Sequence, residues 1–170
     1  MDNIIDFIKN EKTYKGNTIY IKFGTKEDDY LFNKGIDEDI LQMFLSKLLK
    51  NYNYKEYSNM SYSTNKKKLI VNEKENICIE KIIKDYSIYE NYYIEYVDEK
   101  KIPEIMFPCK KHYDYINKNS IISIIIDDLT VNFINNKYIE IKIINNSYID
   151  VSLEKLSDIL EEYLNYWTNL

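Results

Sequence analysis

Apolar and polar residues alternate along the segment 18–25, which predicts a β-strand with one polar face. The polar face carries Thr18, Tyr20 and Lys22, and the apolar face carries Ile19, Ile21 and Phe23. The segment 138–143 repeats this alternation. Strands of this kind can line a barrel whose interior is wet and whose outer surface is packed by helices. We therefore expect the functional side chains on the polar face.

The spacing of apolar residues predicts three helices. A short amphipathic helix is expected at the N-terminus, over residues 4–10. A second helix is expected over residues 36–51, where Asp37 is a suitable N-cap and an apolar stripe follows it. The third helix is expected over residues 152–170.

The rest of the chain is rich in β-branched and aromatic residues, which predicts strands separated by turns. The strands are expected over residues 56–64, 68–72, 77–83, 92–98, 110–116, 121–134 and 137–144. Asparagine-rich connections are expected at residues 65–67, 72–76, 117–119 and 135–136. With the helices, these strands predict one α+β domain over residues 1–170, an antiparallel β-barrel or tunnel of about eight strands flanked by helices at the N-terminus, at 36–51 and at the C-terminus.

Composition narrows the chemistry that the polar face can perform. The sequence contains no arginine, so a planar bidentate clamp on phosphate is excluded. An anion must instead be held by lysine, histidine or backbone N–H groups. The single histidine, His112, excludes a metal site built from several histidines of one chain. The net charge of −5 disfavours broad binding to duplex DNA.

The sequence also bears on the compartment. Cys78 and Cys109 lie far apart without CxxC spacing, which predicts buried thiols in a reducing environment. No apolar run reaches the roughly 18 residues of a membrane span, and the first residues lack the basic region of a signal peptide. We expect a cytoplasmic protein that does not bind membranes.

Several segments resemble, in their order along the chain, the motifs of one enzyme family. They are residues 3–8, 18–25, the helix that begins at Asp37, and residues 79–81, 93–96, 99–101, 110–111, 127–131 and 138–142. They resemble the triphosphate tunnel metalloenzymes, and among these the RNA 5′-triphosphatase domain of mRNA capping enzymes from large DNA viruses and fungi. The resemblance implies a tunnel fold, a link to mRNA capping and a viral source.

In this family, glutamates of the first and last tunnel strands hold a divalent metal such as Mg²⁺ or Mn²⁺. Here the first-strand positions hold Thr18 and Tyr20, and the last strand keeps Glu140. Glu95 stands where the family has an inward arginine, so a repelling charge replaces a phosphate clamp. The metal motifs are therefore degenerate.

Residues on matching positions define the candidate site. The resemblance implies anion binding by Lys22, Lys110, Lys111 and Lys142, and metal binding by Glu140 and Asp128. An alternative is that the same charges form cross-strand ion pairs and bind no ligand. In that case Lys22 would pair with Glu140. Lys142 would then pair with Asp128.

Three functions follow from these observations. The first is a non-catalytic tunnel-fold domain with a structural or regulatory role, or one that binds a nucleotide, a polyphosphate or the triphosphate end of RNA. The second is a small acidic protein-binding module, such as a toxin-neutralising or assembly factor, whose tyrosine-rich face meets a protein partner or a second copy of the chain. The third is an active, metal-dependent RNA or nucleoside triphosphatase with non-standard ligands.

Overall fold

The computed structural model describes residues 17–72, 74–108, 117–144 and 149–168. The helix predicted at the N-terminus and the strand predicted over residues 110–116 lie outside this part of the chain. None of the described helices is long and apolar enough to cross a membrane.

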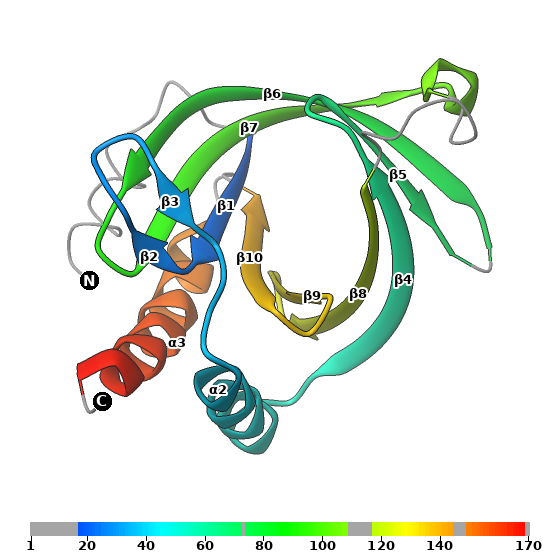
Figure 1. Ribbon diagram of the computed structural model, residues 1–170. Coiled ribbons are helices and arrows are strands. Elements are labelled where there is room, and N and C mark those ends of the chain that lie inside the picture. Colours follow the sequence, from blue (N-terminus) through cyan, green and yellow to red (C-terminus); the bar gives the residue numbers. More distant parts are fainter. Residues whose placement is uncertain (1–16, 73, 109–116, 145–148, 169–170) are drawn as a thin grey trace.

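The described strands of the main sheet close into an eight-stranded antiparallel barrel, as predicted (Figure 1). They are β1 (Thr18–Phe23), β4 (Lys55–Ser63), β5 (Lys67–Val71), β6 (Asn76–Ile88), β7 (Tyr92–Ile102), β8 (Asn117–Ile126), β9 (Leu129–Ile134) and β10 (Tyr138–Ile144). Around the barrel the order is β1-β10-β9-β8-β4-β5-β6-β7, and pairing of β7 with β1 completes the ring. Two short strands, β2 (Thr25–Lys26) and β3 (Phe32–Asn33), form a separate hairpin.

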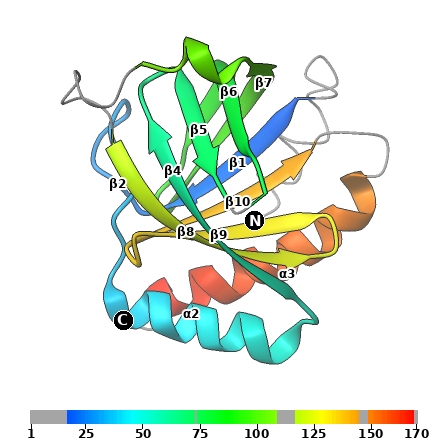
Figure 2. The ribbon, with the colours of Figure 1, turned by 90° about the vertical axis from the view of Figure 1, so that its right-hand side faces the viewer.

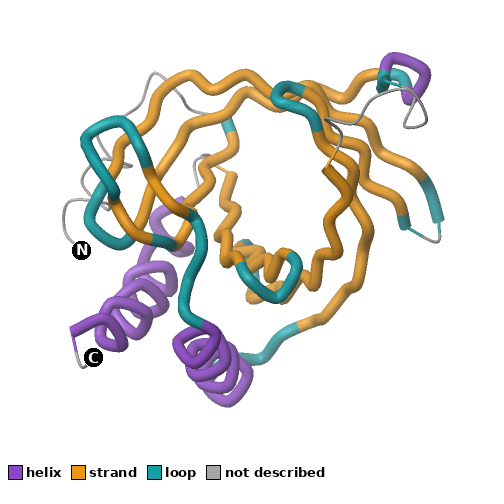
Figure 3. Tube along the Cα trace, in the orientation of Figure 1, coloured by secondary structure: helices purple, strands orange, loops and turns teal. Residues whose placement is uncertain are grey.

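Helices α2 (Glu38–Asn51) and α3 (Ile149–Thr168) lie side by side on the outer surface of the barrel (Figure 2). Figure 3 shows both helices on one side of the ring of strands. The Asp37 carboxylate caps α2 as predicted, because its Oδ1 accepts a hydrogen bond of 2.8 Å from the Asp39 N–H. A short 3-10 helix, η2 (Glu104–Met106), follows β7.

The main core lies between these helices and the outward face of the barrel. Its fully buried members include Ile19, Ile21, Phe23, Ile94, Ile124, Val131, Ile141, Phe44, Leu156 and Tyr163. Phe23 stacks on Tyr163 with 3.7 Å between ring centroids, and the Tyr163 hydroxyl donates to the Asn91 carbonyl at 3.0 Å. The apolar face of β1 is therefore covered by α3, which leaves its polar face for the barrel interior.

One predicted strand and one predicted turn are wrong. The segment 121–134 is two strands, β8 and β9, joined by a turn at Asp127 and Asp128, and Asp127 adopts a left-handed φ of 50°. The expected connection at residues 117–119 lies inside β8. The turn is hard to recognise because both flanking strands are rich in β-branched residues and the Asp127–Asp128 turn contains no glycine.

Candidate functional site

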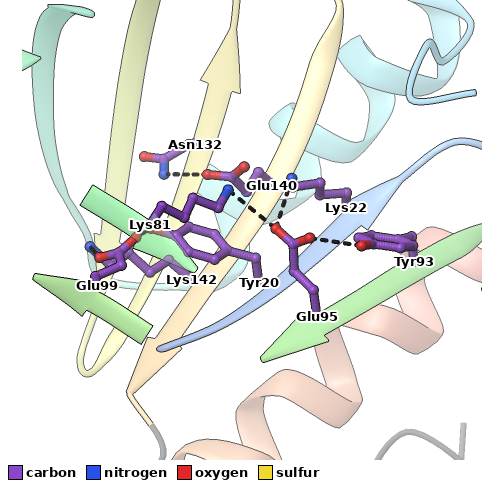
Figure 4. A network of polar contacts seen from close by, with 9 residues as sticks. All are labelled: Tyr20, Lys22, Lys81, Tyr93, Glu95, Glu99, Asn132, Glu140 and Lys142. Atoms are coloured by element: carbon purple, nitrogen blue, oxygen red, sulfur yellow. Dashed lines mark hydrogen bonds and ion pairs between the residues drawn. The ribbon is translucent and has the colours of Figure 1, made fainter. Parts of the chain in front are cut away.

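The polar face of β1 points into the barrel, where all three of its side chains are buried. β1 lies between β7 and β10, so each inward residue has a neighbour on both sides. Tyr20 is opposite Glu95 on β7 and Lys142 on β10. Lys22 is opposite Glu140 on β10. The barrel therefore brings together charges from strands that are distant in the sequence (Figure 4).

Glu95 is the most deeply buried of these charges, with 1% of its side chain exposed. Its Oε1 lies 2.9 Å from Lys22 Nζ and 3.3 Å from Lys81 Nζ, and its Oε2 accepts a hydrogen bond of 2.8 Å from the Tyr93 hydroxyl. Burial alone would raise the pKa of Glu95, but the Lys22 and Lys81 ammonium groups outweigh it and hold the pKa below its ordinary value. Glu95 is therefore an ionised, neutralised carboxylate.

Glu99 forms a second ion-pair centre in the interior. It accepts a hydrogen bond from the Tyr20 hydroxyl, and its Oε2 lies 3.6 Å from Lys142 Nζ. Burial, followed by the charge of Glu99, raises the pKa of Tyr20 well above its ordinary value, so the phenol stays protonated. Lys81 Nζ lies 4.9 Å from the centre of the Tyr20 ring, which adds a cation–π contact.

Glu140 of β10 accepts a hydrogen bond from a neutral side chain. Its Oε1 accepts a hydrogen bond of 3.4 Å from Asn132 Nδ2. The Ser123 hydroxyl fixes the Asn132 side chain by donating to its Oδ1 at 2.7 Å. This chain crosses β8, β9 and β10 and orients the one glutamate that remains of the predicted last-strand motif.

A cavity of about 310 Å³ opens beside this network. Its polar lining includes Tyr20, Asn59, Lys68, Glu99, Ser123, Asp128, Thr130, Asn132 and Lys142, and its apolar lining includes Ile70, Ile79 and Ile121. Burial lowers the pKa of Lys68, and no carboxylate of the described residues forms an ion pair with it. The cavity therefore contains a lysine whose charge is not neutralised by direct contact.

Near Lys22, the β2–β3 hairpin adds aromatic and basic groups to the site. Phe32 of β3 stacks on Tyr93 with 5.8 Å between ring centroids, and the ring of Tyr86 of β6 is tilted against Tyr93 with 5.9 Å between centroids. Lys34 follows the hairpin, and the charge of Lys22, together with burial, lowers the pKa of Lys34 to about 8. Lys34 is thus a further lysine at this site, and repulsion by Lys22 is the main cause of its lowered pKa.

The predicted site residues are only partly brought together. Lys22, Lys142 and Glu140 face the interior, and Asp128 lines the cavity, whereas Lys110 and Lys111 lie outside the described residues. Lys22 forms its ion pair with Glu95, where we expected Glu140, and Lys142 has Glu99 as an ion-pair partner. Closure of the barrel through β1 and β7 supplies these partners.

Sequence reasoning also misjudged Glu95 and missed three lysines. Glu95 does not stand as a bare repelling charge, because Lys22 and Lys81 neutralise it. Lys68 and Lys81 have a recognisable signal, since each lies on the inward face of a strand, whereas Lys34 sits in a connection and has none. Alternation on β6 and β7 would have indicated Lys81 and Glu99 as inward residues.

The donor set fits a divalent metal poorly. Among the described residues, no group of three or more histidine, cysteine or acidic side chains is placed to hold one. Tyr20 uses its hydroxyl as a donor to Glu99 and carries a strongly raised pKa, so it offers no anionic ligand. Glu95 and Glu99 are each bound by lysine. A hard cation needs several free carboxylate oxygens, which this arrangement does not offer.

Comparison with known proteins identifies the fold. No protein-family model matches the chain, and no curated protein matches it by sequence. The Schizosaccharomyces pombe RNA triphosphatase Pct1, solved in complex with the Spt5 CTD, superposes with a TM-score of 0.61 at 12% identity, covering 98% of this chain and 87% of that one. The RNA triphosphatase domain of the trifunctional mimivirus mRNA capping enzyme gives 0.61 at 8% identity, with 95% of each chain covered. The chain has the tunnel fold of RNA triphosphatase domains, as its motifs predicted.

Proposed function

We propose that this tunnel-fold domain binds a triphosphate, at the 5′ end of RNA or on a nucleotide, and does not hydrolyse it. The observation that carries the proposal is the lysine-rich interior of the barrel. Lysine side chains approach it from β1, β5, β6 and β10, namely Lys22, Lys68, Lys81 and Lys142, and Lys34 joins Lys22 from the β3–α2 connection. Lys22 and Lys81 are paired with Glu95, whereas Lys68 and Lys142 line the cavity. In a partly apolar cavity such charges attract phosphate more strongly than they would in water.

The absence of hydrolysis is inferred from the occupied carboxylates. Metal-assisted phosphoryl transfer needs a cation held by free oxygens close to the phosphate chain. Glu95 and Glu99 are instead paired with lysines, and Thr18 and Tyr20 stand at the first-strand positions. Mg²⁺ or Mn²⁺, the cofactors that the family resemblance implies, therefore have no evident place among the described residues.

The fold neighbours support the ligand class and a role in mRNA capping. The two solved structures named above are RNA triphosphatases, and the mimivirus example belongs to an mRNA capping enzyme. We infer that this chain keeps the affinity for a triphosphate end and serves as a binding or regulatory domain. The protein-binding alternative rests on exposed tyrosines such as Tyr30, Tyr54 and Tyr57. We favour triphosphate binding because the charged interior cavity is the more specific chemical feature.

The test uses one RNA oligonucleotide with two different 5′ ends. Purified protein is mixed with the triphosphate-ended RNA or with its hydroxyl-ended counterpart, with Mn²⁺ and with a chelator. Melting temperature and released phosphate are both measured. We expect the triphosphate-ended RNA to raise the melting temperature and the hydroxyl-ended RNA to leave it unchanged, because a ligand that binds only the native state stabilises it. We expect no release of phosphate from either RNA. Phosphate release would establish the active enzyme, and equal melting temperatures for both RNAs would overturn the proposal.

A further inference from the structure

Lys68 is a lysine of the tunnel interior that forms no ion pair with a carboxylate of the described residues. It lies on β5 and lines the 310 Å³ cavity. Burial, the largest influence on it, opposes its positive charge. Lys142 lines the same cavity, with 33% of its side chain exposed and only a long contact of 3.6 Å to Glu99. Both ammonium groups can therefore donate hydrogen bonds to a bound anion.

Apart from the carboxylates of Glu99 and Asp128, the remaining lining of the cavity suits phosphate oxygens. On the β8–β9 side Thr130 provides a hydroxyl group, and the Asn132 amide, which already donates to Glu140, carries a second N–H. Ile70 and Ile79 form an apolar wall next to Lys68, which lowers the local dielectric and strengthens charge–charge attraction. The volume lies near the lower end of the roughly 300–1,000 Å³ that ligand pockets occupy, which is room for a phosphate chain.

A metal-bound phosphate chain would fit this cavity less well than a free one. Mg²⁺ or Mn²⁺ brings two positive charges to a place where Lys68, Lys81 and Lys142 already influence one another. Glu99, the glutamate that lines the cavity, is already engaged by Tyr20 and Lys142, and Glu140 accepts a hydrogen bond from Asn132. The cation would thus add repulsion, and the described interior places no group of three or more histidine, cysteine or acidic side chains around it.

We propose that Lys68 and Lys142 clamp the phosphate chain as a metal-free anion, and that divalent cations weaken its binding. This inference rests on the proposed function and adds to it the form of the ligand and the residues that hold it. The lysine ammonium groups take over the neutralisation of charge for which the related fold would use a metal. Because the clamp needs only phosphate oxygens, inorganic tripolyphosphate is a sufficient probe.

Calorimetric titration with tripolyphosphate, in chelator and in excess Mg²⁺, tests the inference. We expect binding in chelator and an apparent affinity lower by about tenfold or more in Mg²⁺, since the free anion is the species bound. Binding that requires or is strengthened by Mg²⁺ would overturn the metal-free clamp and leave the proposed function standing. If tripolyphosphate and triphosphate-ended RNA both fail to bind under either condition, the proposed function falls as well.

Two lysine variants locate the binding. Lys68→Met should weaken tripolyphosphate binding by about tenfold or more, because one charge-assisted contact is lost. Lys50→Met, an exposed change on α2, should leave the affinity as in the wild type. Lys68→Met should also raise the melting temperature of the free protein, since it removes a half-buried charge that forms no ion pair with a carboxylate of the described residues, so weaker binding cannot reflect unfolding. Wild-type affinity in Lys68→Met would overturn the assignment.

Discussion

At the scale of single residues, Glu95 shows how the barrel tolerates charge in its interior. An isolated carboxylate that is 1% exposed would be strongly destabilising. Lys22, Lys81 and Tyr93 prevent this by surrounding both oxygens with donors. The group of four residues is stable only as a whole, because removing the carboxylate leaves two ammonium groups facing each other without compensation.

Glu95→Gln is therefore expected to destabilise the fold. The amide keeps the size of the side chain but no longer neutralises Lys22 and Lys81, and breaking a buried ion pair typically costs about 3 kcal/mol. The free energy of unfolding in urea measures this loss. Glu161→Gln, on the exposed face of α3, is the control and should change it by less than about 0.5 kcal/mol. Equal losses in the two variants would show that Glu95 is not neutralised as described.

Wild type and Glu95→Gln should also differ in how their stability depends on pH. The pKa of Glu95 is lower in the folded protein than the ordinary 4.5, so the folded state favours its ionised form. This stabilisation is fully present above pH 4.5 and is lost as the pH falls through the lowered pKa. The difference in unfolding free energy between wild type and Glu95→Gln should therefore shrink in strong acid. A difference that grows as the pH falls would contradict the direction of the shift.

At the scale of elements, local pattern predicted those pieces whose signals are short-range. Alternation gave β1 and β10, and the apolar stripe with Asp37 gave α2. The β8–β9 turn was missed because Asp127 takes a left-handed conformation without the asparagine–glycine signature that marks such turns. β6 and β7 extend well beyond their predicted ends, since they pair with each other over most of their length. Such pairing is a tertiary effect that overrides local propensity.

Gly24 offers a test of how the β2–β3 hairpin is attached to the barrel. A Cβ at Gly24 would lie 1.9 Å from the backbone oxygen of Asn33, so the hairpin would have to move. Gly24→Ala is expected to reduce the unfolding free energy by about 2 kcal/mol, the usual cost of overpacking. At Gly35 the added Cβ would meet only the Asn33 side chain, at 3.3 Å, and Gly35→Ala should cost clearly less. Urea unfolding of both variants measures the difference, and equal costs would contradict the close packing at Gly24.

At the scale of the whole molecule, the sequence predicted the kind of barrel but not the pairing inside it. The inward position of Lys22 and Glu140 follows from alternation alone. The contacts of Lys22 with Glu95 and of Tyr20 with Glu99 depend on how β7 closes against β1, which no local pattern encodes. The sequence left the interior open between an anion and metal site and a set of cross-strand ion pairs, and the described side chains form lysine and glutamate pairs with partners that differ from those expected.

Charge is also distributed unevenly across the molecule, and this leads to a last prediction. The protein as a whole carries −5, while lysines gather inside the barrel. Non-specific binding to duplex DNA depends on neutralising many phosphates along an exposed surface, which an acidic protein does poorly. Under the proposed function, a single phosphate chain instead binds the interior lysines. Fluorescence anisotropy with labelled duplex DNA and labelled triphosphate-ended RNA should therefore show binding of the RNA alone.

The 5′ end should control that binding. Replacing the triphosphate by a hydroxyl removes the group that we propose to bind Lys68 and Lys142, so affinity for the same RNA should fall by about tenfold or more. Added salt should weaken the triphosphate-ended complex only moderately, because few phosphates are engaged and the cavity excludes part of the screening solvent. Equal binding of duplex DNA and both RNAs would contradict this prediction. It would show that the outer surface binds nucleic acid despite the negative net charge of the protein.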